Sequence, residues 1–163
     1  MTHPGEQFYP EGVRWDDPIA RGTLPDLLSQ AARDYGARPV IEFRDRAISY
    51  AELEGLVKAA AAAYLRVGYG KGTSVALFLG NTPDHPINFF GALKAGARIV
   101  HLSPLDGEIA LTHKLRDSNA RVLVTSTRAL ESFNLWVSAI SPSSGDRCTS
   151  RAPAFRAPKK FVG

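Results

Sequence analysis

The sequence predicts an α/β protein in which helices flank a parallel sheet and a small β hairpin precedes that sheet. From residue 74 onwards, apolar runs alternate with segments of helical periodicity in the order β-α-β-α-β. This order is typical of parallel strands joined by helical crossovers. Residues 74–79, SVALFL, are continuously apolar, which predicts a strand buried on both faces of the sheet.

The amino-terminal part predicts a lead-in, a helix and a hairpin. Residues 1–19 are rich in turn-forming residues and predict an extended lead-in. Residues 23–26, TLPD, predict a capped helix start with proline in the first turn, and Gly36 marks the end of that helix. The apolar face of this helix is predicted to consist of Leu24, Leu27, Leu28, Ala31, Ala32 and Tyr35. Residues 40–43 and 47–50 alternate around a short polar turn, as the strands of a hairpin do.

A second, longer helix is predicted from Ser49 to Gly68. Its first residues, SYAE, match a capping box, in which a serine and a glutamate bond each other's backbone N–H groups. The alanine run 59–63 makes the helix narrow, so neighbouring elements can approach it closely. One face of this helix is predicted to carry Leu53, Leu56, Val57, Ala60, Tyr64 and Leu65.

The remaining elements follow in alternation. Thr82-Pro83 predicts the start of a helix that continues through Lys94, and Gly96 follows as a residue that tolerates positive φ. A strand is predicted at 98–102, and Pro104 stops it because proline has no N–H to donate. A helix at 107–118 and an edge strand at 121–125 complete the alternation.

Two segments carry a resemblance to a known family. Ile48–Leu53 (ISYAEL) and Leu93–Asp106 (LKAGARIVHLSPLD) resemble, in order and spacing, the first two core motifs of the AMP-forming acyl-CoA synthetases, the AMP-dependent synthetase and ligase family. The resemblance covers about residues 8–127. It implies that residues 20–127 form the first portion of the large N-terminal domain of the acyl-adenylate-forming fold.

The resemblance also implies an activity. Full-length relatives activate a carboxylic acid with ATP to an acyl-adenylate and pyrophosphate, transfer the acyl group to coenzyme A, and use Mg. Both motifs look architectural in relatives, and the family's phosphate loop, nucleotide-contacting motifs, hinge and lysine have no counterpart in this sequence. We therefore expect no catalytic, cofactor-binding or metal-binding residue here, and an inactive part of a ligase for a fatty or dicarboxylic acid. The alternative is a non-catalytic pseudogene product or scaffold remnant.

Residues 128–163 differ in composition from the body. They hold six serines and three prolines, and too few periodic apolar residues to offset the loss of chain entropy on folding. The whole net charge of +4 comes from this tail, because residues 1–127 carry 14 basic and 14 acidic side chains. A nucleic-acid partner is therefore not expected. Two explanations stay open: a reading-frame change near residue 128, giving a sequence unrelated to the body, or a genuine disordered tail.

Several residues partly match known binding or catalytic motifs, but none of them completes such a motif. The loop Gly68–Thr73 mimics a phosphate loop, but it precedes a strand and does not open a helix. His85, His101 and His113 show no metal-binding spacing, and His3 lies at the amino terminus. A stand-alone nucleotide-binding module is therefore the least favoured class.

The remaining polar candidates have structural explanations. Asp84 and Asp106 lie at predicted helix starts, where capping and the helix dipole account for them. Cys148 lies in the biased tail. The stretch 141–146, compared together with Ser126 to the family's phosphate loop, lacks the threonine/glycine repeat and the lysine of such a loop and is a chance match.

The sequence indicates a cytoplasmic location. The amino terminus has no basic and apolar signal pattern, no run is long enough to span a membrane, and one cysteine cannot form an internal disulfide. Small molecules (a carboxylic acid, ATP and CoA in full-length relatives) are the only partners implied, with no specific protein partner.

Overall fold

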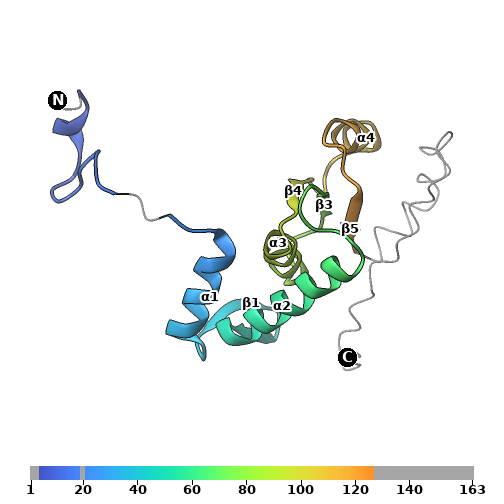
Figure 1. The fold of residues 1–163 in the computed structure, drawn as a ribbon, viewed down its shortest axis with the longest axis horizontal. Coiled ribbons are helices and arrows are strands. Elements are labelled where there is room, and N and C mark those ends of the chain that lie inside the picture. Colours follow the sequence, from blue (N-terminus) through green and yellow to red (C-terminus); the bar gives the residue numbers. More distant parts are fainter. Residues whose placement is uncertain (1–3, 19–20, 127–163) are drawn as a thin grey trace.

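The computed structural model describes residues 4–18 and 21–126, so the predictions for the tail at 128–163 and for Cys148 lie outside the described residues. Figure 1 shows the arrangement. In chain order the elements are η1 (Glu6–Phe8), α1 (Leu24–Tyr35), β1 (Pro39–Phe43), β2 (Arg46–Ser49), α2 (Tyr50–Arg66), β3 (Ser74–Phe78), α3 (Asp84–Lys94), β4 (Arg98–His101), α4 (Glu108–Asp117) and β5 (Val122–Thr125).

The predicted parallel sheet is confirmed. Its strand order is β4-β3-β5, and both neighbours run parallel to β3. Ala76 of β3 is in register with Val100 of β4 on one side and with Leu123 of β5 on the other. Every residue of β3 except Phe78 is buried, as expected for a central strand covered on both faces.

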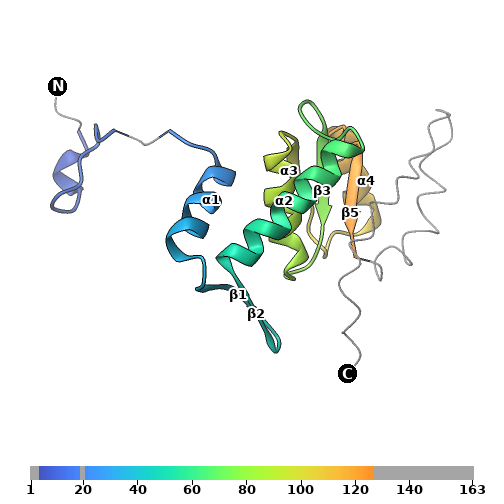
Figure 2. The same cartoon turned by 60° about the horizontal axis from the view of Figure 1, so that its bottom comes forward.

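Helices cover both faces of this sheet. Val75 and Leu77 belong to a core that includes Tyr64 of α2 and Ala92 of α3. Because side chains alternate along a strand, Ala76 lies on the opposite face, in a core with Leu111 of α4. Figure 2 shows α2 and α3 on one side of the strands and α4 on the other.

A second core joins the amino-terminal elements to this unit. The predicted hairpin is confirmed: β1 and β2 pair antiparallel, and Arg44 in their turn has a φ of 54°. The core under the hairpin contains buried side chains of α1, β2, α2 and α3. These side chains are Leu28, Ile48, Leu53, Val57, Ala60 and Ile87.

The helix ends agree with the sequence in most details. The Thr23 side chain and Asp26 form a reciprocal capping box, and Gly68 and Gly96 take positive φ directly after α2 and α3 end. At α2 the box is only half formed, because Ser49 accepts a bond from the Glu52 N–H whereas the Glu52 carboxylate pairs with Arg46. This corrects the prediction of a complete capping box there.

Two further expectations are corrected. Thr82 does not cap α3 with its side chain: the cap is Pro83, and Thr82 accepts the His85 N–H through its backbone carbonyl. The predicted apolar face of α1 is mostly open, since Leu28 is buried but Leu27 is 64% exposed. The helix contacts α2 and α3, but Leu24 and Tyr35 stay about half exposed, with the Tyr35 ring centroid 6.2 Å from that of Tyr50.

None of the helices within residues 4–18 and 21–126 is both long and apolar enough to cross a membrane.

Candidate functional site

The carboxyl ends of the three parallel strands meet at one edge of the sheet, which we call the carboxyl edge. It consists of the residues at and just after the ends of β3, β4 and β5, together with the start of α3. In open α/β sheets, ligands bind outside the carboxyl ends of the strands. The fold therefore makes this edge the candidate position for a ligand site.

Three aromatic rings gather at the carboxyl edge: His85 and Phe89 from α3 and His101 from β4. The ring centroids of His85 and His101 are 5.4 Å apart, with an interplanar angle of 22°. Phe89 lies 5.4 Å from His101 and 6.5 Å from His85. Burial lowers the pKa of His85, and the nearby His101 lowers it further, so the neutral imidazole is favoured.

The strand register explains how His101 reaches α3. His101 pairs with Leu77 across the β3–β4 ladder, and Leu77 lies on the face that α2 and α3 cover. The histidine spacing in the sequence does not reveal this contact, because the two residues are on different elements. One signal does exist: the first turn of a crossover helix and the last residue of the next parallel strand both lie at the carboxyl edge.

The third histidine is elsewhere. His113 lies on α4, where its Nδ1 is 2.9 Å from Asp117 Oδ2. The described residues contain no group of three or more His, Cys, Asp or Glu side chains able to hold a metal ion.

Asp106 fixes the loop that leaves β4. Its carboxylate accepts the Ser103 N–H at 3.0 Å and forms an ion pair with Lys114 Nζ of α4 at 2.8 Å. The Lys114 bond above all, with the Ser103 N–H, holds the pKa of Asp106 below its ordinary value. The cap of α4 is Gly107, so Asp106 closes the loop and is not the helix cap that the sequence predicts. Asp84 lies in the first turn of α3 as predicted.

Thr125 ends β5 at the same edge, on the face that α4 covers, in register with Phe78. Within the described part of the chain, its Oγ1 atom is buried and has no hydrogen-bond partner. Such a buried hydroxyl normally finds one. Ser126 follows it directly.

The phosphate-loop mimic lies at the opposite edge. Gly68–Thr73 connects α2 to β3 and so precedes the amino end of the strand, as the sequence predicts. Gly72 takes a φ of 86°, and the Thr73 carbonyl accepts the Arg98 N–H at 2.8 Å, which aligns β4 with β3. The loop therefore serves as a connection and does not open a helix toward an anion.

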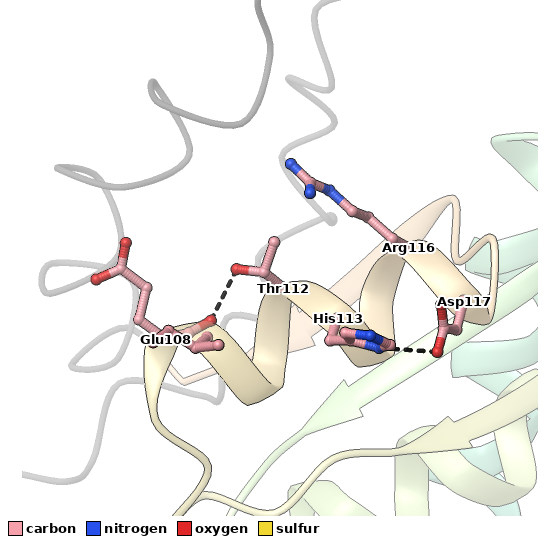
Figure 3. Close-up of a pocket in the computed structure, with 6 residues that line it drawn as sticks. Glu108, Thr112, His113, Arg116 and Asp117 are labelled. Carbon is pink, nitrogen blue, oxygen red and sulfur yellow. Dashed lines mark hydrogen bonds and ion pairs between the residues drawn. The ribbon is translucent and has the colours of Figure 1, made fainter.

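Two surface hollows lie away from the carboxyl edge. One runs along the outer face of α4 (Figure 3), where Thr112 bonds the Glu108 carbonyl and Arg116 points away from the His113–Asp117 pair. The other lies between the start of α1 and the end of α3, beside Lys94. Both are open, and the described residues that line the first all come from one helix.

Solved structures similar to this fold include parts of adenylate-forming proteins. The N-terminal subdomain of Klebsiella oxytoca NpsA, solved in complex with 3-hydroxyanthranilyl-AMSN, aligns with a TM-score of 0.61 and 26% identity. The alignment covers 65% of this chain and 28% of that one. The fold of this chain is therefore that of the N-terminal part of adenylate-forming enzymes.

The sequence comparisons agree with the fold. The profile of the AMP-binding enzyme family matches residues 28–156, and the chain belongs to that family. The long-chain-fatty-acid–CoA ligase of Escherichia coli O6:H1 is 34% identical over 119 residues, which is 71% of this chain and 21% of the ligase. The 4-coumarate–CoA ligase 3 of Oryza sativa subsp. japonica is 32% identical over 111 residues, 67% of this chain and 20% of that enzyme. The chain thus spans about a fifth of the length of these relatives.

Proposed function

We propose that residues 20–127 are a scaffold portion of an ATP-dependent, AMP-forming acid–CoA ligase of the cytoplasm. The observation that carries the proposal is the match to a long-chain-fatty-acid–CoA ligase over 71% of this chain, in a region that folds like the N-terminal subdomain of NpsA. That subdomain binds 3-hydroxyanthranilyl-AMSN. The scaffold would hold the carboxyl edge in place for ligand-binding loops.

The contacts of the described residues support a scaffold role. Mg²⁺ prefers free oxygen ligands, but the Asp106 carboxylate is already bonded to Lys114 and Ser103. The glycine-rich loop 68–73 lies at the opposite edge, where it cannot cradle a phosphate at the carboxyl edge. The described residues therefore do not fit Mg·ATP by themselves, and we derive no catalytic step from them.

For the substrate, we propose a carboxylic acid with a long aliphatic part, either a fatty or a dicarboxylic acid. The name of the Escherichia coli relative supports the fatty acid, whereas the rice relative acts on an aromatic acid, 4-coumarate. We expect CoA to be the acyl acceptor, as the names of both relatives indicate.

We further propose that the 163-residue chain alone is inactive. Adenylation depends on groups that stabilise the developing charge, each worth about 10²–10³ in rate, and the described residues do not supply them. The test is ATP–pyrophosphate exchange with fatty, dicarboxylic and aromatic acids, with the Escherichia coli ligase as positive control. No acid-dependent exchange is expected. Exchange above background would overturn this proposal.

A chimera separates a functional scaffold from a scaffold remnant. Residues 20–127 replace the homologous segment of the Escherichia coli ligase, and acyl-CoA formation is measured. If the segment is a working scaffold, the chimera forms acyl-CoA, whereas the matched chimera with Leu77→Asp does not. A chimera that folds but forms no product would favour the pseudogene product or remnant.

The boundary at residue 127 is also a proposal. We propose that residues 128–163 do not belong to the fold, through either a frame change or a disordered tail, although the family profile continues to residue 156. Translating the DNA downstream of codon 127 in all three frames tests the frame change: a Ser/Thr/Gly-rich loop ending in lysine would support it. Strong amide protection across 141–163 in hydrogen exchange would contradict the boundary.

A further inference from the structure

The His85–His101 pair is a side-chain cluster that the proposed scaffold role leaves unexplained. The two imidazoles come from different elements and meet at the carboxyl edge, with ring centroids 5.4 Å apart. Neither ring forms a hydrogen bond or ion pair within residues 4–18 and 21–126, whereas His113 is bonded to Asp117. We propose that His85 and His101 together bind one divalent transition-metal ion, with Zn²⁺ as the probe.

The separation of the rings fits a shared ion. Two imidazoles that bind one tetrahedral Zn²⁺ at Zn–N distances of about 2.1 Å have their ring centres about 5 Å apart. The observed 5.4 Å is close to that separation. The rings now face each other, so one must turn to direct a nitrogen at the ion. His101 is exposed and can turn at the surface, whereas His85 is partly buried.

The ligand type sets the class of metal. Imidazole nitrogen suits Zn²⁺, Ni²⁺ and Cu²⁺, whereas Mg²⁺ and Ca²⁺ prefer oxygen. Because no third metal-binding side chain of the described residues joins the pair, water completes the coordination. The site is therefore open, and a ligand with a nitrogen or oxygen donor could bind the ion at the carboxyl edge.

Metal binding would tie the start of α3 to the end of β4. The two elements are otherwise joined by a tight turn at the other edge, where the Ala97 N–H donates to the Ala92 carbonyl at 3.0 Å. An ion bound by His85 and His101 would link α3 to β4 at the carboxyl edge as well. Because it binds the folded state and not the separated histidines, it raises the unfolding temperature by mass action.

The experiment uses the full chain carrying Cys148→Ser and His3→Asn, which removes two other metal-binding groups. Zn²⁺ binding is measured by calorimetric titration, and thermal unfolding is followed with and without Zn²⁺. We expect one site and a higher unfolding temperature with Zn²⁺. The loss of an outer-sphere partner alone weakens metal binding about 10–100-fold, so His85→Asn or His101→Asn should weaken it at least about tenfold.

His113→Asn is the matched control, since it removes an exposed histidine that lies on another element. It should leave Zn²⁺ affinity and the thermal shift unchanged. Absence of binding, equal affinity in His85→Asn or His101→Asn, or loss of binding in His113→Asn would each overturn the inference. The inference does not depend on the ligase assignment, so failure of either leaves the other intact.

Discussion

Gly91 of α3 lies so close to Ala60 of α2 that a Cβ atom added at Gly91 would be 2.7 Å from the Cβ of Ala60. The backbone nitrogen of Ala61 would be 3.4 Å away. The alanine run at 59–63 therefore permits the close approach that its small side chains predict. Because both sides of the contact are helix backbone and Cβ atoms, neither can move aside without shifting a helix.

Gly91→Ala should destabilise the fold. Overpacking typically costs about 1–3 kcal/mol, and here it outweighs the gain of about 0.5–1 kcal/mol that alanine gives over glycine inside a helix. Urea unfolding measures the difference. Gly55→Ala in α2 is the control, because an added Cβ there meets nothing within 4 Å. It should raise the free energy of unfolding; equal effects of the two substitutions would contradict the packing.

Leu77→Asp should prevent folding. Leu77 is 1% exposed in β3, the central strand of the sheet, where an aspartate would place an unpaired charge in the core. Circular dichroism and a urea transition detect the loss. Leu105→Asp is the comparison, since Leu105 is 94% exposed and its replacement should leave the transition unchanged. A normal transition for Leu77→Asp would disprove the buried central strand.

Tyr64 should make the fold sensitive to alkali. Its hydroxyl donates to Asn88 Oδ1 at 2.8 Å, and burial raises its pKa from 10.0 to about 12. A raised folded-state pKa means that the stabilisation is present below pH 10 and is lost as the pH rises toward about 12. Tyr64→Phe should abolish this part of the pH dependence in urea unfolding. An identical decline in both proteins would show that Tyr64 is not its source.

Asp106 should make the fold sensitive to acid. Its pKa is held below the ordinary value of 3.8, so its stabilisation is present above that value and is lost as the pH falls through the lowered pKa. At neutral pH, Asp106→Asn should therefore be less stable than the unsubstituted chain, and the difference should shrink in strong acid. Lys114→Gln should reproduce part of the loss. If the difference did not change with pH, the carboxylate would not be responsible.

Local patterns predict most of the fold. The capped start of α1 at Thr23, the positive φ of Gly96 and the buried run of β3 each depend on neighbours in sequence, so the sequence contains the cause. The role of Glu52 is harder to predict, because its carboxylate chooses between the backbone at Ser49 and the side chain of Arg46 across a turn. Which of these two partners Glu52 bonds is determined only once the hairpin has folded.

The candidate site is less predictable for the same reason. His85 and His101 meet only when α3 has packed on the face of β4 that carries His101, and no spacing between them encodes this. Likewise, Asp106 looks like a helix cap until the loop 103–107 brings it to Lys114. Contacts between elements depend on register and packing, which a periodic pattern constrains but does not specify.

The position of β3 has a consequence for how the chain assembles during synthesis. It is the first strand of the parallel sheet to leave the ribosome and also the central one. β4 and then β5 follow it in the chain and pair with it, one on each flank, each after a connection containing a single helix. Pairing in chain order therefore extends the sheet outward from its central strand. Each step closes only a short loop, and no strand has to insert between two strands that are already paired.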